Sequence, residues 1–96
     1  MPYIPKAYPK FKRIKKKLPQ PLLLEIDRQV DLICENPLLG EPKGGDLKGV
    51  WVHKFRYLRE EYLLAYQVDH KTKIIILLAI GGHENFYRDL KRYLRG

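Results

Sequence analysis

The stretch EYLLAYQV (residues 61–68), KIIILLAI (73–80) and GGHENFY (81–87) decides the fold. The first segment has the aromatic and aliphatic residues of a strand, and the second is apolar at almost every position, which is typical of a strand covered on both faces. Because a short polar turn at 69–72 joins them, we predict an antiparallel pair of strands, 62–68 and 74–80. His83 follows the second strand, so its side chain is expected to be held firmly at a strand end.

A further strand is predicted at residues 50–57, after a connector at 38–49 that is rich in glycine and proline. Its side chains alternate between an apolar face and a more basic face. The first face carries Trp51, His53, Phe55 and Tyr57, and the second carries Val52, Lys54 and Arg56.

The N-terminal third predicts a helical hairpin. From Ala7 to Leu18 the apolar residues recur every three or four positions and lysines fill the other faces, as in a basic amphipathic helix. Pro19 and Pro21 end this helix, and a second one follows until Asn36-Pro37 stops it. The prolines in Met1 to Pro5 restrict that segment to an edge strand or an arm, and residues 86–94 predict a short basic C-terminal helix or turn.

These elements predict an α+β fold. Two N-terminal helices pack on one side of a twisted, mostly antiparallel sheet of three to four strands, and a short C-terminal helix follows. The other face of the sheet and its C-terminal edge are expected to form a basic concave surface. The length of 96 residues is that of one domain, so residues 1–96 are predicted to form a single domain.

The net charge of +8 indicates a polyanionic partner. Residues 1–18 hold seven of the 19 basic residues and none of the 11 acidic ones, so the charge is concentrated near the N-terminus. A basic surface attracts nucleic acid by releasing condensed counterions, and that attraction weakens as salt rises. An acidic protein partner, or a lysine-rich helix that is merely solvated, remains an alternative at this point.

Several other sites are predicted to be absent or structural. Cys34 cannot form an intramolecular disulfide and is expected to pack in the core of a cytosolic protein. His53 and His70 are expected to be structural, as are Tyr57, Tyr62 and Tyr66. The histidines lack the spacing of metal ligands, so no metal or cofactor is predicted. No apolar segment is long enough for a signal peptide or a membrane span, so the protein is expected to be cytoplasmic.

The order of the motifs resembles that of the RelE/ParE superfamily of bacterial toxins over roughly residues 6–94. The shared features are the two helices, the strands and the basic C-terminal segment, together with four short anchors. These are Glu35-Asn36-Pro37, Gly45-Asp46-Leu47-Lys48-Gly49, Tyr66-Gln67-Val68-Asp69, and a glycine followed by His83 and Tyr87.

The resemblance implies a toxin of a type II toxin-antitoxin system. RelE-like members cleave mRNA, usually in the ribosomal A site, and an antitoxin protein holds them inactive. ParE-like members share the fold but inhibit DNA gyrase and lack the nuclease residues. A third alternative is a binding module for RNA or antitoxin that has lost catalysis.

The site residues favour one branch of this superfamily. RelE has arginine where this chain has Leu63 and again where it has His83, so the arginine-based site is not reproduced. The closer likeness is to YafQ-like toxins, in which an acid precedes an aromatic-Leu-Leu-X-Tyr strand and a histidine stands four residues before an aromatic. Glu61 and the pair His83 and Tyr87 occupy those positions.

The chemistry expected of these residues is metal-independent cleavage of RNA through its own 2'-hydroxyl. That reaction needs a base for the hydroxyl proton and an acid for the departing 5'-oxygen, each worth roughly 100 to 10,000-fold. We predict His83 as the acid, because histidine ordinarily exchanges its proton near neutral pH. Glu61 is predicted either to act as the base or to orient and charge His83.

The remaining site residues are predicted to hold the RNA. Lys54 and Arg56 lie on one face of a strand and could hold the scissile phosphate and stabilise its extra charge. Arg59 could assist from the adjacent loop. Tyr87 is predicted with His83 and Glu61 as a catalytic residue, and it could stack on a base or bond the phosphate. The predicted partners are a cognate antitoxin together with mRNA and the ribosome. The antitoxin is expected to be acidic, at least in the segment that covers the basic surface of the toxin.

Overall fold

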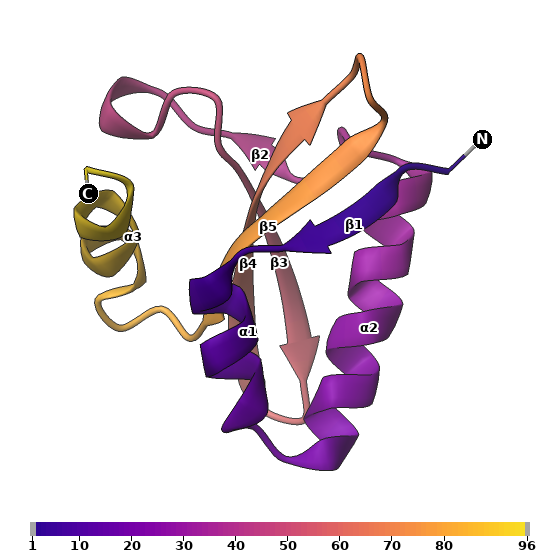
Figure 1. Cartoon of the computed structure of the whole chain (residues 1–96). Coiled ribbons are helices and arrows are strands. Elements are labelled where there is room, and N and C mark those ends of the chain that lie inside the picture. Colours follow the sequence, from indigo (N-terminus) through magenta and orange to yellow (C-terminus); the bar gives the residue numbers. More distant parts are fainter. Residues whose placement is uncertain (1, 96) are drawn as a thin grey trace.

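The computed structural model describes residues 2–95 and has a five-stranded sheet with helices on both of its faces (Figure 1). Met1, which the N-terminal arm was expected to include, and Gly96, the last residue of the predicted domain, lie outside the described residues. In chain order the elements are β1 (Ile4–Ala7), α1 (Pro9–Lys16), α2 (Gln20–Glu35), β2 (Glu41–Pro42), a 3-10 turn (Gly45–Leu47), β3 (Trp51–Tyr57), β4 (Glu60–Asp69), β5 (Ile74–Gly81) and α3 (Phe86–Leu94).

The predicted α+β class is confirmed. The strand order is β1-β5-β4-β3-β2, in which β2 to β5 pair antiparallel and β1 pairs parallel with β5. The sheet has five strands because the two edge strands, of four and two residues, add to the three predicted from their patterns. β5 lies next to β1 and β4, and its almost continuous apolar sequence reflects burial of both its faces.

The boundary between β1 and α1 differs from the prediction. Lys6 and Ala7 pair with β5, whereas the apolar spacing had included Ala7 in the helix. The Tyr8 N–H also donates to the Leu77 carbonyl at 3.0 Å, so the chain stays extended until Pro9 begins α1. Proline suits the first turn of a helix because it has no N–H to leave unpaired. The edge position of β1 agrees with the prediction from the prolines.

The first core lies between the sheet and the hairpin of α1 and α2. Phe11 of α1 and the inward residues of α2 pack on one face of β3, β4 and β5. The α2 members of this core are Leu22, Ile26, Val30, Ile33 and Cys34. Their three- and four-residue spacing is the pattern from which the helix was predicted, and the helix ends at Glu35, just before Asn36-Pro37.

The second core covers the other face and corrects an expectation. Phe86 and Leu90 of α3, with Leu47 of the 3-10 turn, pack on Leu63 and Leu78. Much of the face that was expected to be a free basic surface is therefore closed by α3, which lies on the side of the sheet opposite α2 (Figure 1). Beside the end of the β3–β4 hairpin this face still carries the exposed side chains of Lys54 and Arg56.

The β3–β4 hairpin fixes the positions of the predicted site residues. Tyr57 pairs with Glu60, so only Leu58 and Arg59 form the turn. β4 begins at Glu60 and not at Tyr62 as predicted, so Glu61 is a strand residue and not part of a loop. The cross-strand partner of Glu61 is Arg56.

The connector before β3 is attached to the sheet by a buried tyrosine. The Tyr66 hydroxyl donates to the Pro37 carbonyl at 2.7 Å and accepts from the Gly40 N–H at 2.9 Å. Tyr66 is fully buried, which agrees with its predicted core role. Its two bonds fix the chain between α2 and β2.

Within residues 2–95, no helix has the length and apolar character needed to cross a membrane.

Candidate active site

His83 and Glu61 are hydrogen-bonded at the end of the central strands. Leu63 pairs with Gly81, so the chain just beyond β5 lies next to the start of β4, two residues before Leu63. There the Nε2 atom of His83 bonds the Oε1 atom of Glu61. The His83 side chain is 51% exposed and that of Glu61 34%, so both can reach a ligand in solution.

Lys54 and Arg56 lie beside this pair. Arg56 is directly opposite Glu61, and Lys54 is opposite Leu63, on the same face of the hairpin. The bond from His83 is the main cause of a lowered pKa at Glu61, and the charges of His83, Lys54 and Arg56 add to it. Glu61 is therefore a carboxylate throughout the neutral pH range. Four predicted site residues are thus brought together by the register of β3, β4 and β5.

Leu63, at the position where RelE has an arginine, is a core residue in this protein. Its side chain is fully buried beneath α3, in contact with the second core. A residue pointing into that core cannot meet a ligand in solution. The exposed cations next to Leu63, Lys54 and Arg56, come from the neighbouring strand β3.

Arg59 lies in the β3–β4 turn, as predicted. The guanidinium of Arg56 is 3.4 Å from the backbone carbonyl oxygen of Arg59, a long contact. No hydrogen bond or ion pair of the Arg59 side chain is present among the described residues, so it remains a predicted RNA contact. Leu58 beside it has a left-handed backbone with φ of 56° and is 83% exposed.

Tyr87 contacts α3, the second core and Lys43, and not the other predicted site residues among those described. It lies in the first turn of α3, packs partly against the second core and meets Phe86 edge to face. The Lys43 ammonium lies 5.3 Å from the centre of its ring. Among residues 2–95, no hydrogen bond joins Tyr87 to His83 or Glu61, so its predicted catalytic role is not supported by a direct contact.

Lys43 is a cation that the sequence did not single out. Its Nζ atom bonds the Oε1 atom of Glu41 at 2.8 Å, and Glu41 pairs with Val52 on the edge of β3. The charge of Lys54 also contributes to a lowered pKa at Glu41, after the larger effects of Lys43. Glu41 and Lys43 therefore extend the charged surface from Lys54 towards the sheet edge. They lie between Gly40 and Gly44 in the connector that is rich in glycine and proline, which gave no pattern from which to predict these contacts.

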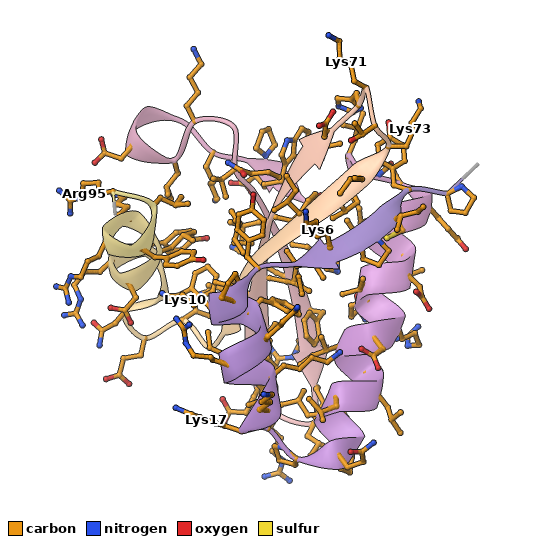
Figure 2. All side chains as sticks on the ribbon, viewed as in Figure 1. Lys6, Lys10, Lys17, Lys71, Lys73 and Arg95 are labelled. Atoms are coloured by element: carbon orange, nitrogen blue, oxygen red, sulfur yellow. The ribbon has the colours of Figure 1, made fainter. Side chains whose placement is uncertain are left out.

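Basic side chains also surround the rest of the molecule. Figure 2 labels Lys6 on β1, Lys10 on α1, Lys17 just after α1, Lys71 and Lys73 in the β4–β5 turn, and Arg95 just after α3. Lys10 of α1 lies 5.0 Å from the ring centre of Tyr93 in α3. The basic N-terminal segment and the basic C-terminal helix therefore meet, although they are far apart in sequence.

The residues predicted to be structural have structural contacts. His53 Nε2 lies 2.7 Å from Gln29 Oε1 at the boundary of α2 and the sheet, and burial lowers the pKa of His53. His70 Nδ1 lies 2.8 Å from the Tyr3 hydroxyl. Burial is the main reason that the pKa of the Cys34 thiol is raised to about 11. Within the described part of the chain, no three acidic, histidine or cysteine side chains are grouped as a metal would require.

Comparison with known proteins identifies relatives of the whole fold. The sequence model of a family described as "ParE-like toxin of type II bacterial toxin-antitoxin system" matches residues 6–91. No protein of curated function matches the sequence.

Solved structures of RelE toxins have a similar fold. The toxin-antitoxin complex RelBE2 of Mycobacterium tuberculosis contains a chain that is 22% identical, with a TM-score of 0.75, over 86% of this chain and 100% of that one. A double arginine-to-alanine mutant of Escherichia coli RelE in the free state is 18% identical, with a TM-score of 0.77. The match covers 99% of this chain and 98% of that one. The RelE-RelB complex of Pyrococcus horikoshii contains a chain that is 20% identical, with a TM-score of 0.62, over 88% of this chain and 98% of that one. At these identities the likeness establishes the fold alone.

Proposed function

Because the chain belongs to the ParE-like toxins of type II bacterial toxin-antitoxin systems, we propose that it is a metal-independent endoribonuclease that cleaves mRNA on the ribosome. One observation carries the proposal: His83 and Glu61 are hydrogen-bonded on an exposed surface beside Lys54 and Arg56. This group contains an acid, a carboxylate and two cations, which are the components that cleavage through a 2'-hydroxyl needs.

His83 protonates the departing oxygen in this mechanism. Its Nε2 atom is bound to Glu61, so Nδ1 is the nitrogen that faces the substrate. The 2'-oxygen attacks the phosphorus, the bond from phosphorus to the 5'-oxygen breaks, and the Nδ1 proton of His83 passes to that oxygen. The products are a 2',3'-cyclic phosphate and a 5'-hydroxyl end.

Glu61 accepts the 2'-hydroxyl proton through Oε2, the oxygen that does not bond His83. Its lowered pKa makes it a weak base, so we expect this step to contribute near the lower end of the roughly 100 to 10,000-fold range of general acid-base catalysis. Glu61 also keeps His83 oriented, because its Oε1 atom bonds Nε2 of the ring. After each turnover Glu61 Oε2 loses its proton to water and His83 Nδ1 takes one up from water, since both side chains are exposed.

Lys54 and Arg56 bind the scissile phosphate. Both side chains are exposed and point to the face that carries Glu61. An arginine can hold two phosphate oxygens at once, and a lysine acts as a compact charge. Because negative charge increases on these oxygens in the transition state, the two cations stabilise it more than they stabilise the substrate.

The partner that restrains this activity is an antitoxin. Two of the similar solved structures, from Mycobacterium tuberculosis and Pyrococcus horikoshii, are complexes with one. The net charge of +8 favours an antitoxin that is acidic in its toxin-binding segment.

Controlled expression tests the proposal. Inducing the wild-type gene is expected to arrest growth while mRNA is fragmented, and His83→Ala or Glu61→Ala is expected to restore growth at equal protein levels. His70→Ala is the matched control, because His70 bonds only Tyr3 among the described residues and lies in the β4–β5 turn. The control is expected to remain toxic.

The outcome also separates the alternative functions. Growth arrest with intact transcripts and an induced DNA-damage response would contradict the nuclease and favour gyrase inhibition. The ParE-like family of the chain is the reason to test this alternative. Harmless expression of a folded wild-type protein would instead favour a binding module without catalysis.

A further inference from the structure

A hollow lies at the sheet edge next to Lys54. It has a volume of about 310 Å³ and is lined by Leu39, Gly40 and Glu41 on one side and by Val52, His53 and Lys54 on the other. The hollow exists because β2 pairs only with Trp51 and Val52. Among residues 2–95, no strand pairs with this edge of β3 beyond Val52.

The open edge presents backbone groups that a ligand can bond. The Val50 carbonyl accepts from the Lys43 N–H on the β2 side of the strand. Backbone groups of every second residue in an antiparallel strand point to the same edge, so those of Lys54 face the hollow. A donor and an acceptor are therefore side by side where no strand covers them. The edge of a nucleobase also presents a donor next to an acceptor.

The rest of the lining suits a flat ring with an amino group. Leu39 is 40% exposed and supplies an apolar contact. Glu41 is bonded to Lys43 through Oε1, and its side chain is 67% exposed. A carboxylate can only accept hydrogen bonds, so it favours a base that carries an exocyclic amino group over uracil, which has a carbonyl in that place.

Lys54 joins the hollow to the catalytic pair, since it lines the hollow and also lies on the face of Glu61. A volume of about 310 Å³ is at the small end of ligand sites, which suits a single base better than a larger group. We propose that the hollow is a nucleobase subsite that binds an amino-bearing base while the 3'-phosphate of the same nucleotide lies at Lys54. This inference rests on the proposed ribonuclease function and adds a preference for the base 5' of the cleaved bond.

Cytidine and uridine 3'-monophosphates test the subsite, because they differ at the group that Glu41 would meet. Each is titrated into the ¹⁵N-labelled wild-type protein, with inorganic phosphate as the probe of the phosphate position alone. Cytidine 3'-monophosphate is expected to shift the amide signals of Gly40, Glu41 and Lys54 and to bind several-fold more tightly than the uridine compound. Phosphate is expected to shift Lys54 and to leave Gly40 unchanged.

Two variants identify the contacts. Glu41→Gln is expected to reduce the preference for cytidine over uridine by up to about tenfold, the effect of one hydrogen bond to a charged group. Leu39→Trp is expected to fill the hollow and weaken both nucleotides, while phosphate binding stays. Glu35→Gln, the same chemical change at an exposed residue that ends α2, is the matched control and is expected to bind as wild type.

The result that would overturn the subsite is equal binding of the two nucleotides, or shifts confined to residues outside the hollow. Failure of the nuclease proposal is distinguishable, because mononucleotide binding needs no cleavage. RNA cleavage without nucleotide binding in the hollow removes only the subsite. Nucleotide binding by a protein that does not cleave RNA removes only the nuclease.

Discussion

Removal of the Tyr66 hydroxyl should destabilise the protein without changing its surface. In Tyr66→Phe, the Pro37 carbonyl loses a donor at 2.7 Å and the Gly40 N–H loses an acceptor at 2.9 Å. Each bond contributes about 0.5–1.5 kcal/mol, so we expect the free energy of unfolding to fall by about 2 kcal/mol. For a chain of this length, that corresponds to a lower Tm by about 8–16 °C.

Urea denaturation measures this loss. The midpoint is expected to fall by about 1–2 M with an unchanged slope, because the folded surface is the same. Hydrogen exchange should also become faster at the Gly40 amide, since that N–H has lost its acceptor. These two results together would locate the effect in the connector between α2 and β2.

Tyr57→Phe is the matched control. Its hydroxyl makes no hydrogen bond among the described residues, so the free energy of unfolding should change by less than about 0.5 kcal/mol. A Tyr66→Phe protein as stable as this control would refute the reasoning, because the buried hydroxyl would then contribute nothing to holding Pro37 and Gly40.

Three further predictions concern the site and the core. Lys54→Ala and Arg56→Ala should each lower kcat/KM for an RNA oligonucleotide by about 10 to 100-fold, because each removes one charged contact. Lys54→Arg should retain more activity than Lys54→Ala. A kcat/KM equal to that of wild type in all three variants would contradict a phosphate-binding role. The lowered pKa of Glu61 means that its contribution to stability is present above its unfolded pKa and is lost as pH falls through the lower folded value. In an NMR titration, His83→Ala should therefore move the Glu61 midpoint upward, and an unmoved midpoint would argue against the hydrogen bond. Because burial raises the pKa of Cys34 to about 11, the folded protein should react slowly with a thiol reagent at pH 8 and rapidly in denaturant; rapid reaction of the folded protein would contradict the burial.

The central strands and α2 could be predicted because their patterns are local. The apolar run at 73–80 fixes a covered strand whatever its neighbours are, and Asn36-Pro37 stops a helix by backbone geometry alone. The proximity of His83 to Glu61 was predicted from the resemblance to known toxins. Its physical basis, the pairing of Leu63 with Gly81, is set by register and cannot be read from either segment alone.

The edge strands and the second core depend on contacts between distant residues. Lys6 and Ala7 are extended because they pair with β5, although their spacing also fits the start of a helix. Pro9 was a usable signal for the true start of α1 that the apolar spacing concealed. Lys43 reaches Tyr87 only through the fold of the connector, so no sequence pattern predicted that contact.

The most direct test of the central claim is the end chemistry of RNA cut by purified protein in the presence of a metal chelator. We expect wild type to leave 2',3'-cyclic phosphate and 5'-hydroxyl ends, and His83→Ala to cut at least about 100-fold more slowly while keeping the wild-type Tm. The reaction is best measured with and without ribosomes, since cleavage in either condition reports on the same side chains. A folded His83→Ala protein that cuts as fast as wild type would contradict the account.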